Sequence, residues 1–219
     1  MNYLQLCNAV LKELNEVEIV SVASTRGIQS AVKDFINKAQ KDVINSELEW
    51  PFTYANGSIT TASGTGEYTL AADLKTIDQD TVYIDLGGSK SLMPLEYLAY
   101  DEYIRDYLSL NSDPNDNHLA EPRNFYITQD SKLGLYPEPD GVYTISYQYW
   151  STHSDMASNT DTPVVPERFH DIIINRAKYY AYMLRSDLQS AQLTDRDYRE
   201  GITRMRVELI NRKDYMRAV

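Results

Sequence analysis

The sequence predicts an α+β fold in which an antiparallel four-helix bundle, built from both chain ends, carries an inserted small antiparallel β-sandwich or barrel domain. Three observations predict it. Apolar residues recur every three or four positions near both termini, the period falls to two in the middle of the chain, and turn residues separate the segments there. The expected parts are a helical bundle domain from 1–52 and 163–219, an inserted β domain over 53–150, and a linker over 151–162.

The N-terminal part of the bundle is expected to hold two helices. The first, over residues 2–14, has an apolar stripe that contains Cys7, which we interpret as a small core residue. The second, over 25–52, is expected to be capped by Ser24 or Thr25 and to end at Pro51, which cannot continue the hydrogen-bond ladder. Its predicted bundle-core residues are Ile28, Val32, Phe35, Ile36 and Trp50.

Alternating residues around turn sequences predict three β-hairpins in the inserted domain. These hairpins join residues 58–61 with 67–70, 81–85 with 90–93, and 124–128 with 132–136. A last strand from Val142 to Trp150 places Tyr143, Ile145, Tyr147 and Tyr149 on one face. One helix, over about 94–110, is expected to interrupt the strands.

The C-terminal part returns to helical spacing and is basic. Pro166 suits the first turn of a helix, and a final helix is expected from about Ser190 to Met216. Residues 176–219 hold ten Lys and Arg against six Asp and Glu, a net of +4, whereas the rest of the chain has a net of −15. Two interpretations are open: a solvated face with intrahelical ion pairs, or a surface that docks against an acidic protein.

Composition excludes several classes of protein. The formal net charge of −11 disfavours tight general binding of nucleic acid. One cysteine permits no internal disulfide and suits a reducing compartment, and we expect neither a signal peptide nor a membrane span. The 18 tyrosines, against four phenylalanines, predict contact surfaces, either on half-exposed sheets or at protein interfaces.

No motif in the chain predicts catalysis, a cofactor or a metal. The histidines His118, His153 and His170 have no metal-ligand spacing, and we expect them at the surface. The loop that begins at Asp113 starts like a calcium loop but has His118 and Asn124 where that pattern needs Gly and Glu. We therefore expect a protein that is not an enzyme and that binds no cofactor and no metal.

Several segments together resemble a known family. They are Arg26-Gly27-Ile28-Gln29, the helix end Trp50-Pro51-Phe52, the loop Gly134-Leu135-Tyr136-Pro137-Glu138-Pro139-Asp140-Gly141, and Val165-Pro166-Glu167-Arg168-Phe169. Over nearly its whole length the chain resembles the adaptor, or head-to-tail connector, proteins of tailed bacteriophages.

This resemblance implies a structural virion protein, assembled in the host cytoplasm and located at the head–tail junction. It implies a homo-oligomeric ring, twelve-fold in the family, that binds the portal protein after DNA packaging, extends the DNA channel and provides the attachment platform for the tail or nozzle protein. Packaged DNA would pass through without sequence-specific binding, and no membrane is involved. The C-terminal segment would reach the portal, and its expected portal-binding residues are Arg204, Arg206, Arg212, Lys213, Tyr215, Met216 and Arg217.

Three alternatives are open. Within virion assembly, the chain could be another tail-tube or stopper component built on the same bundle. In another class, it could be a carbohydrate- or protein-binding module that uses the tyrosine-rich sheet as a stacking surface. An enzyme is the third alternative and would need a pocket with convergent titratable groups.

Overall fold

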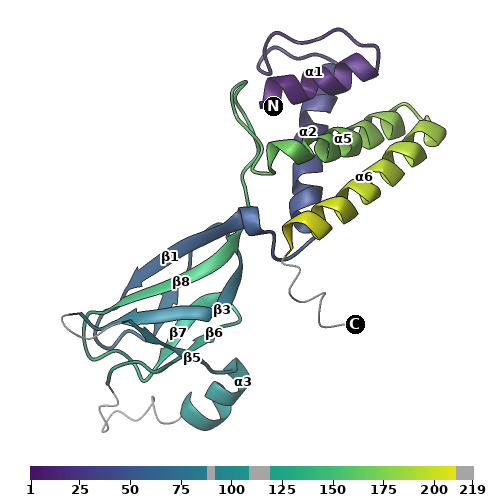
Figure 1. The fold of residues 1–219 in the computed structure, drawn as a ribbon. Coiled ribbons are helices and arrows are strands. Elements are labelled where there is room, and N and C mark those ends of the chain that lie inside the picture. The colour runs from purple at the N-terminus through teal and green to yellow at the C-terminus, as the bar shows by residue number, and fades with distance from the viewer. Residues whose placement is uncertain (88–91, 109–118, 211–219) are drawn as a thin grey trace, which may run out of the picture. The chain divides into compact units, whose positions relative to one another are not determined.

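A computed structural model describes residues 1–87, 92–108 and 119–210 of the chain, which divides into two compact units (Figure 1). The helical unit comprises Met1–Thr53 together with the chain from Thr152 onward, and the β unit comprises Tyr54–Ser151. The protein is therefore a mixed α+β protein with helices and two sheets. The helical unit draws on both ends of the sequence, whereas the β unit is one continuous stretch.

The helices of the helical unit share one apolar core. They are α1 (Tyr3–Glu13), α2 (Ile28–Asn45), α5 (His170–Leu184) and α6 (Leu188–Leu209), with short 3-10 turns η1 (Pro51–Thr53) and η3 (Glu167–Phe169). The core takes residues from all four helices, including Leu6, Ile36, Ile172 and Met205. The regular antiparallel four-helix bundle stays a prediction.

Helix α1 begins with a reciprocal cap. The Asn2 side chain accepts from the Gln5 backbone N–H at 2.9 Å, and the Gln5 side chain accepts from the Asn2 N–H at 2.9 Å. Cys7 is fully buried in the core, which confirms its interpretation as a core residue. Burial raises the pKa of the Cys7 thiol to about 12, so it stays protonated at neutral pH.

Helix α2 is shorter at both ends than the sequence predicts. It begins after Gly27, which has φ +55° and offers no side-chain cap, so the prediction of a Ser24 or Thr25 cap is wrong. At the other end, the Ser46 hydroxyl and the Trp50 indole both donate to the Val43 carbonyl, at 2.7 and 2.9 Å. The Ser46 backbone N–H also donates to this carbonyl, at 3.3 Å, and the three bonds end the helix before Pro51.

The expected linker was 151–162, but Ser151 ends strand β8, and from Thr152 onward the segment belongs to the helical unit and contacts α2. The Asn37 side chain donates to the Met156 carbonyl at 3.0 Å and accepts from the Met156 N–H at 3.1 Å. Met156 itself is 6% exposed in the shared core. The polar composition of the segment gave no sign of these contacts. The Asn37 side chain satisfies both backbone groups of Met156, as a neighbouring strand would do in a sheet.

His170 is buried, which contradicts its expected place at the surface. Its Nε2 donates to the Val165 carbonyl at 2.9 Å, and its Nδ1 lies 3.2 Å from the Met1 amino nitrogen. Burial lowers the pKa of His170, although the Val165 carbonyl and the neighbouring carboxylates of Glu167 and Asp171 favour its protonated form.

The buried His170 predicts a loss of stability in weak acid. Because its folded pKa is lowered, the unfolded chain takes up a proton as the pH falls below about 6.5 while the native chain does not. We expect His170→Gln to make the free energy of unfolding fall less between pH 7 and pH 5, as measured by urea titration at each pH. Parallel pH profiles for the two proteins would contradict this role.

The β unit contains two four-stranded sheets. The first has the order β1 (Tyr54–Thr60), β8 (Thr144–Ser151), β3 (Leu74–Asp85) and β4 (Met93–Pro94). The second has the order β2 (Glu67–Thr69), β7 (Lys132–Tyr136), β6 (Asn124–Ile127) and β5 (Glu96–Tyr97). Neighbouring strands are antiparallel except β5 and β6, which are parallel. Closure into a sandwich or barrel stays a prediction.

Two of the three predicted hairpins are confirmed and one is wrong. Strand β3 pairs with β4, and β6 pairs with β7, as expected. The segments 58–61 and 67–70 do not pair with each other, because β1 pairs with β8 and β2 pairs with β7 in the other sheet. The Tyr68 hydroxyl, which donates to the Thr65 carbonyl at 2.6 Å, holds the connection between the sheets.

Within the described residues, the helix predicted over 94–110 is wrong before Tyr100 and is present only from Tyr100 onward. Leu95 donates to the Val82 carbonyl and Leu98 to the Phe125 carbonyl, so this stretch is extended and carries β4 and β5. Helical backbone begins only at α3 (Tyr100–Glu102) and continues as a π-helical turn, η2 (Tyr103–Tyr107). Approximate apolar spacing from Leu95 onward misled the prediction, because these leucines fill the core of a sheet.

Two glycines of the β unit lie beneath tyrosine rings. A Cβ atom at Gly134 would stand 2.1 Å from the ring of its cross-strand partner Tyr126, and one at Gly57 would stand 2.3 Å from the ring of Tyr147. Tyr126 in turn stacks on Tyr103, with 3.9 Å between ring centroids. The absence of a side chain at each glycine makes room for a buried aromatic ring.

Candidate assembly surface

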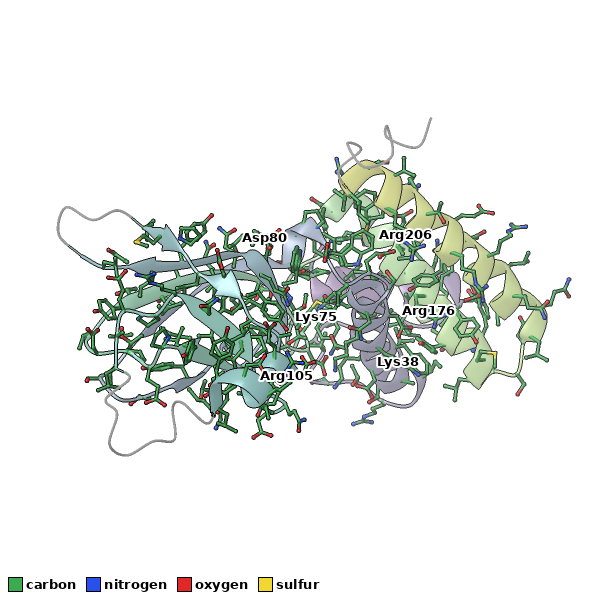
Figure 2. The ribbon with its side chains drawn as sticks, turned by 90° about the horizontal axis from the view of Figure 1, so that it is seen from below. Lys38, Lys75, Asp80, Arg105, Arg176 and Arg206 are labelled. Carbon is green, nitrogen blue, oxygen red and sulfur yellow. The ribbon has the colours of Figure 1, made fainter. Side chains whose placement is uncertain are left out.

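The described members of the expected portal-binding set, Arg204 and Arg206, lie near the end of α6. Arg204 Nη2 lies 2.7 Å from Asp171 Oδ2 on α5. Arg206 pairs with Glu47, and its Nη2 donates to the Ser46 carbonyl at 3.1 Å, just beyond α2. Figure 2 shows Arg206 where α6 meets the rest of the helical unit. Both arginines therefore attach α6 to its own chain and hold the point from which the C-terminal segment starts.

The other expected portal-binding residues lie outside the described residues. They are Arg212, Lys213, Tyr215, Met216 and Arg217. Two arginines nearer the start of α6 pair with carboxylates of the same helix, since Arg196 lies 3.8 Å from Glu200 and Arg199 lies 2.8 Å from Asp195. Intrahelical pairing, the first of the two interpretations of this basic helix, therefore describes this part of α6.

Arg176 joins three helices at the centre of the surface formed by α2, α5 and α6 (Figure 2). Its Nε lies 2.5 Å from Asp42 Oδ2 on α2, and its Nη1 lies 3.0 Å from Asp195 Oδ1 on α6. Burial alone would lower the pKa of Arg176, but the hydrogen bond and charge of Asp42 outweigh it, and the pKa is raised. The guanidinium therefore stays charged between two carboxylates.

Tyrosine rings surround this guanidinium. The Arg176 carbon Cζ lies 4.8 to 4.9 Å from the ring centroids of Tyr179, Tyr180 and Tyr198. The Tyr180 hydroxyl also donates to Asp42, and burial together with this bond raises the Tyr180 pKa to about 12. The cluster combines ion pairs with cation–π contacts, and it fixes α6 against α2 and α5.

The predicted bundle-core residues all belong to the core of the helical unit or pack on it. Val32, Ile36 and Trp50 are fully buried, and Ile28 and Phe35 are partly buried against the same core. The Phe35 ring contacts Tyr180, with 5.7 Å between centroids. Through Phe35, this face of α2 therefore contacts the tyrosine ring that packs on the Arg176 guanidinium.

An exposed apolar patch at the turn between α5 and α6 was not predicted. Met183, Leu184, Leu188 and Leu193 are 43%, 57%, 60% and 51% exposed. Arg185, inside the turn, pairs with Glu16 and donates to the Leu14 carbonyl at 3.1 Å, which fixes the turn against the end of α1. Apolar residues on both sides of the polar stretch Arg185-Ser186-Asp187 were the available signal, and such a patch suits contact with another protein.

The described residues contain neither a group of side chains that could hold a metal ion nor a helix that could span a membrane. Among residues 1–87, 92–108 and 119–210, no three His, Cys, Asp or Glu side chains are grouped so as to hold a metal ion. The incomplete calcium pattern that begins at Asp113 lies outside those ranges. No helix of the described chain is long and apolar enough to cross a membrane.

The whole chain, residues 1–219, matches the family described as SU10 adaptor protein. The chain belongs to this family. The resemblance to tailed-phage adaptors is thereby confirmed. As a SU10 adaptor protein, it has a structural role at the phage head–tail junction and is a component of the virion. Adaptors of this family are typically non-enzymatic. No curated protein matches the chain.

Proposed function

We propose that the protein forms an adaptor ring that binds the portal once DNA is packaged, extends the DNA channel and offers the platform on which the tail or nozzle assembles. The observation that carries this proposal is the family match over all 219 residues. Twelve copies per ring is the number that the adaptor resemblance implies.

The proposed portal contact is the C-terminal segment 211–219. It follows directly on α6, whose last turns are attached to α5 through Arg204 and Asp171, and to the end of α2 through Arg206 and Glu47. The segment contains basic residues beside Tyr215 and Met216, a combination that suits an acidic surface with apolar pockets. Repetition of one modest contact around a ring raises the overall affinity through effective concentration.

Charge supports the proposed channel. Residues 1–175 have a net charge of −15, so their surface repels the phosphates of packaged DNA. Phosphate-binding proteins instead gather Lys and Arg and lose affinity as salt is added. DNA would therefore slide past the ring without sequence-specific binding.

Removal of residues 211–219 is expected to abolish portal binding and to leave the protein folded. The cut belongs after Ile210, because Met205 is fully buried and Arg206 contacts Ser46 and Glu47. We expect the urea midpoint to be unchanged and co-sedimentation with the cognate portal to fall at least about tenfold, which is about 1.4 kcal/mol. Arg196→Ala, a change on the solvated face of α6, is the matched control. Full portal binding by the shortened protein would refute this role of the segment.

One observation favours a second candidate function, binding of carbohydrate by the β unit. A hollow of about 590 Å³ on the first sheet is lined by the apolar Leu92, by Tyr147 and the exposed Tyr83, and by amide and hydroxyl side chains that include Asn56, Ser58 and Gln148. Such groups suit sugar hydroxyls and ring faces. A glycan array probed with the full chain tests this function. Carbohydrate binding predicts a signal, and no signal on any glycan would contradict it.

A further inference from the structure

A hollow in the helical unit is lined by two buried polar atoms that have no hydrogen-bond partner in the part of the chain that the structure describes. It has a volume of about 510 Å³ and lies between α2 and the segment 153–164. Gln40 of α2 lines it and is only 3% exposed, yet its Oε1 has no hydrogen-bond partner among the described residues. His153 Nδ1, also buried and also in this lining, has none either in that part of the chain.

Two unpaired buried polar atoms in one small hollow need an explanation. An amide left without a partner costs about 1–3 kcal/mol, so such groups are rare unless a ligand or ordered water completes them. Gln40 Oε1 is an acceptor, and His153 Nδ1 is an acceptor in the tautomer with its proton on Nε2. When His153 is in that tautomer, an occupant that completes both atoms donates at two positions.

The charge of the hollow selects a cation. Its lining contains Asp155 and Asp161 and no Lys or Arg. Asp155 is already paired with Lys41 at 2.7 Å, outside the lining, so Asp161 is the carboxylate that remains for a ligand. The Ser158 and Ala157 N–H groups both donate to Asp161 Oδ2 and lower its pKa, which keeps the carboxylate ionised.

We propose that this hollow binds the guanidinium group of an arginine side chain presented by a different protein. Guanidinium carries five N–H donors in a planar fork, which matches acceptors on Gln40, His153 and Asp161, whereas an ammonium is a compact point charge. The described arginines of α5 and α6 are paired with carboxylates of their own chain, so they are not the source of this guanidinium. That the partner is a portal or tail protein rests on the proposed function.

A titration of the full chain with Nα-acetyl-L-arginine N-methylamide tests the site. We expect saturable NMR shifts of the Gln40 side-chain amide, with affinity at least tenfold weaker in Gln40→Met and in His153→Phe. The citrulline analogue, which has the same shape without charge, should give no saturable shift, and the lysine analogue should bind more weakly than arginine. Gln189→Met, on an exposed residue of α6, is the control and should bind as the unchanged protein does.

The urea midpoint of Gln40→Met distinguishes a ligand site from a hollow that is filled by an ordered water molecule. Since Gln40 Oε1 has no partner among the described residues, Gln40→Met should leave the urea midpoint unchanged or raise it. A lower midpoint without any arginine response would show that water completes the hollow, and it would overturn the proposal. Equal shifts with citrulline, or self-association that Gln40→Met abolishes, would also overturn it. These readouts use no portal, so they can fail while the 211–219 deletion still abolishes portal binding, and the reverse also holds.

Discussion

Replacement of Arg176 with methionine is expected to destabilise the helical unit by about 2–4 kcal/mol. Removal of one member of a buried ion pair costs about 3–5 kcal/mol, and the arginine side chain is 20% exposed, so solvent reduces the loss. The change leaves Asp42 charged beside the Tyr180 hydroxyl, and it also removes three cation–π contacts. Urea unfolding followed by far-UV circular dichroism measures the effect.

Arg199→Met is the matched control for this variant. Arg199 binds the same carboxylate, Asp195, at 2.8 Å, but its side chain is 76% exposed, so its loss should cost no more than about 1 kcal/mol. The double variant Arg176→Met with Asp42→Asn should recover part of the loss, because no uncompensated charge remains on α2. If Arg176→Met costs no more than Arg199→Met, the cluster does not hold the three helices together.

Replacement of Gly134 with alanine is expected to cost the β unit about 2–3 kcal/mol. The new Cβ would stand 2.1 Å from the Tyr126 ring, and Tyr126 is 2% exposed and stacked on Tyr103, so the ring has no free space to enter. Differential scanning calorimetry and the near-UV tyrosine signal should both report the change.

The control for Gly134 is Gly141→Ala. A Cβ atom at Gly141 would meet the Tyr143 ring at 3.8 Å, an ordinary contact, so its effect should stay within about 0.5 kcal/mol. Equal melting temperatures for the two alanine variants would show that the Tyr126 ring moves aside freely and that no space beneath it is required.

Local patterns in the sequence predicted the elements whose partners are near in the chain. The 3.6-residue period placed α1 and α5, and a short polar turn placed the β6–β7 hairpin, because these signals are complete within a dozen residues. The failed cap of α2 is a local error, whereas the failed hairpin involves distant partners. Strands β1 and β8 are far apart in sequence. The residues around Ser58 therefore do not indicate that it pairs with Ser146.

The same limit applies to the candidate site. The sequence indicated a basic surface on α6, but the carboxylate that binds Arg204 lies 33 residues away, and the carbonyl that binds Arg206 lies 160 residues away. Charge counting cannot separate arginines already committed to their own chain from those that can bind a partner. Nor can it reveal Gln40, whose importance depends on burial and on the absence of a hydrogen-bond partner within the described residues.

The division of the chain has a consequence for biosynthesis. The β unit, Tyr54–Ser151, emerges from the ribosome complete, whereas α1 and α2 emerge long before the C-terminal helices that cover them. Domains generally fold as units during translation. Helix α5 packs on α2, and the shared core also takes residues from α6, so the helical unit can close only after the whole β unit has been synthesised.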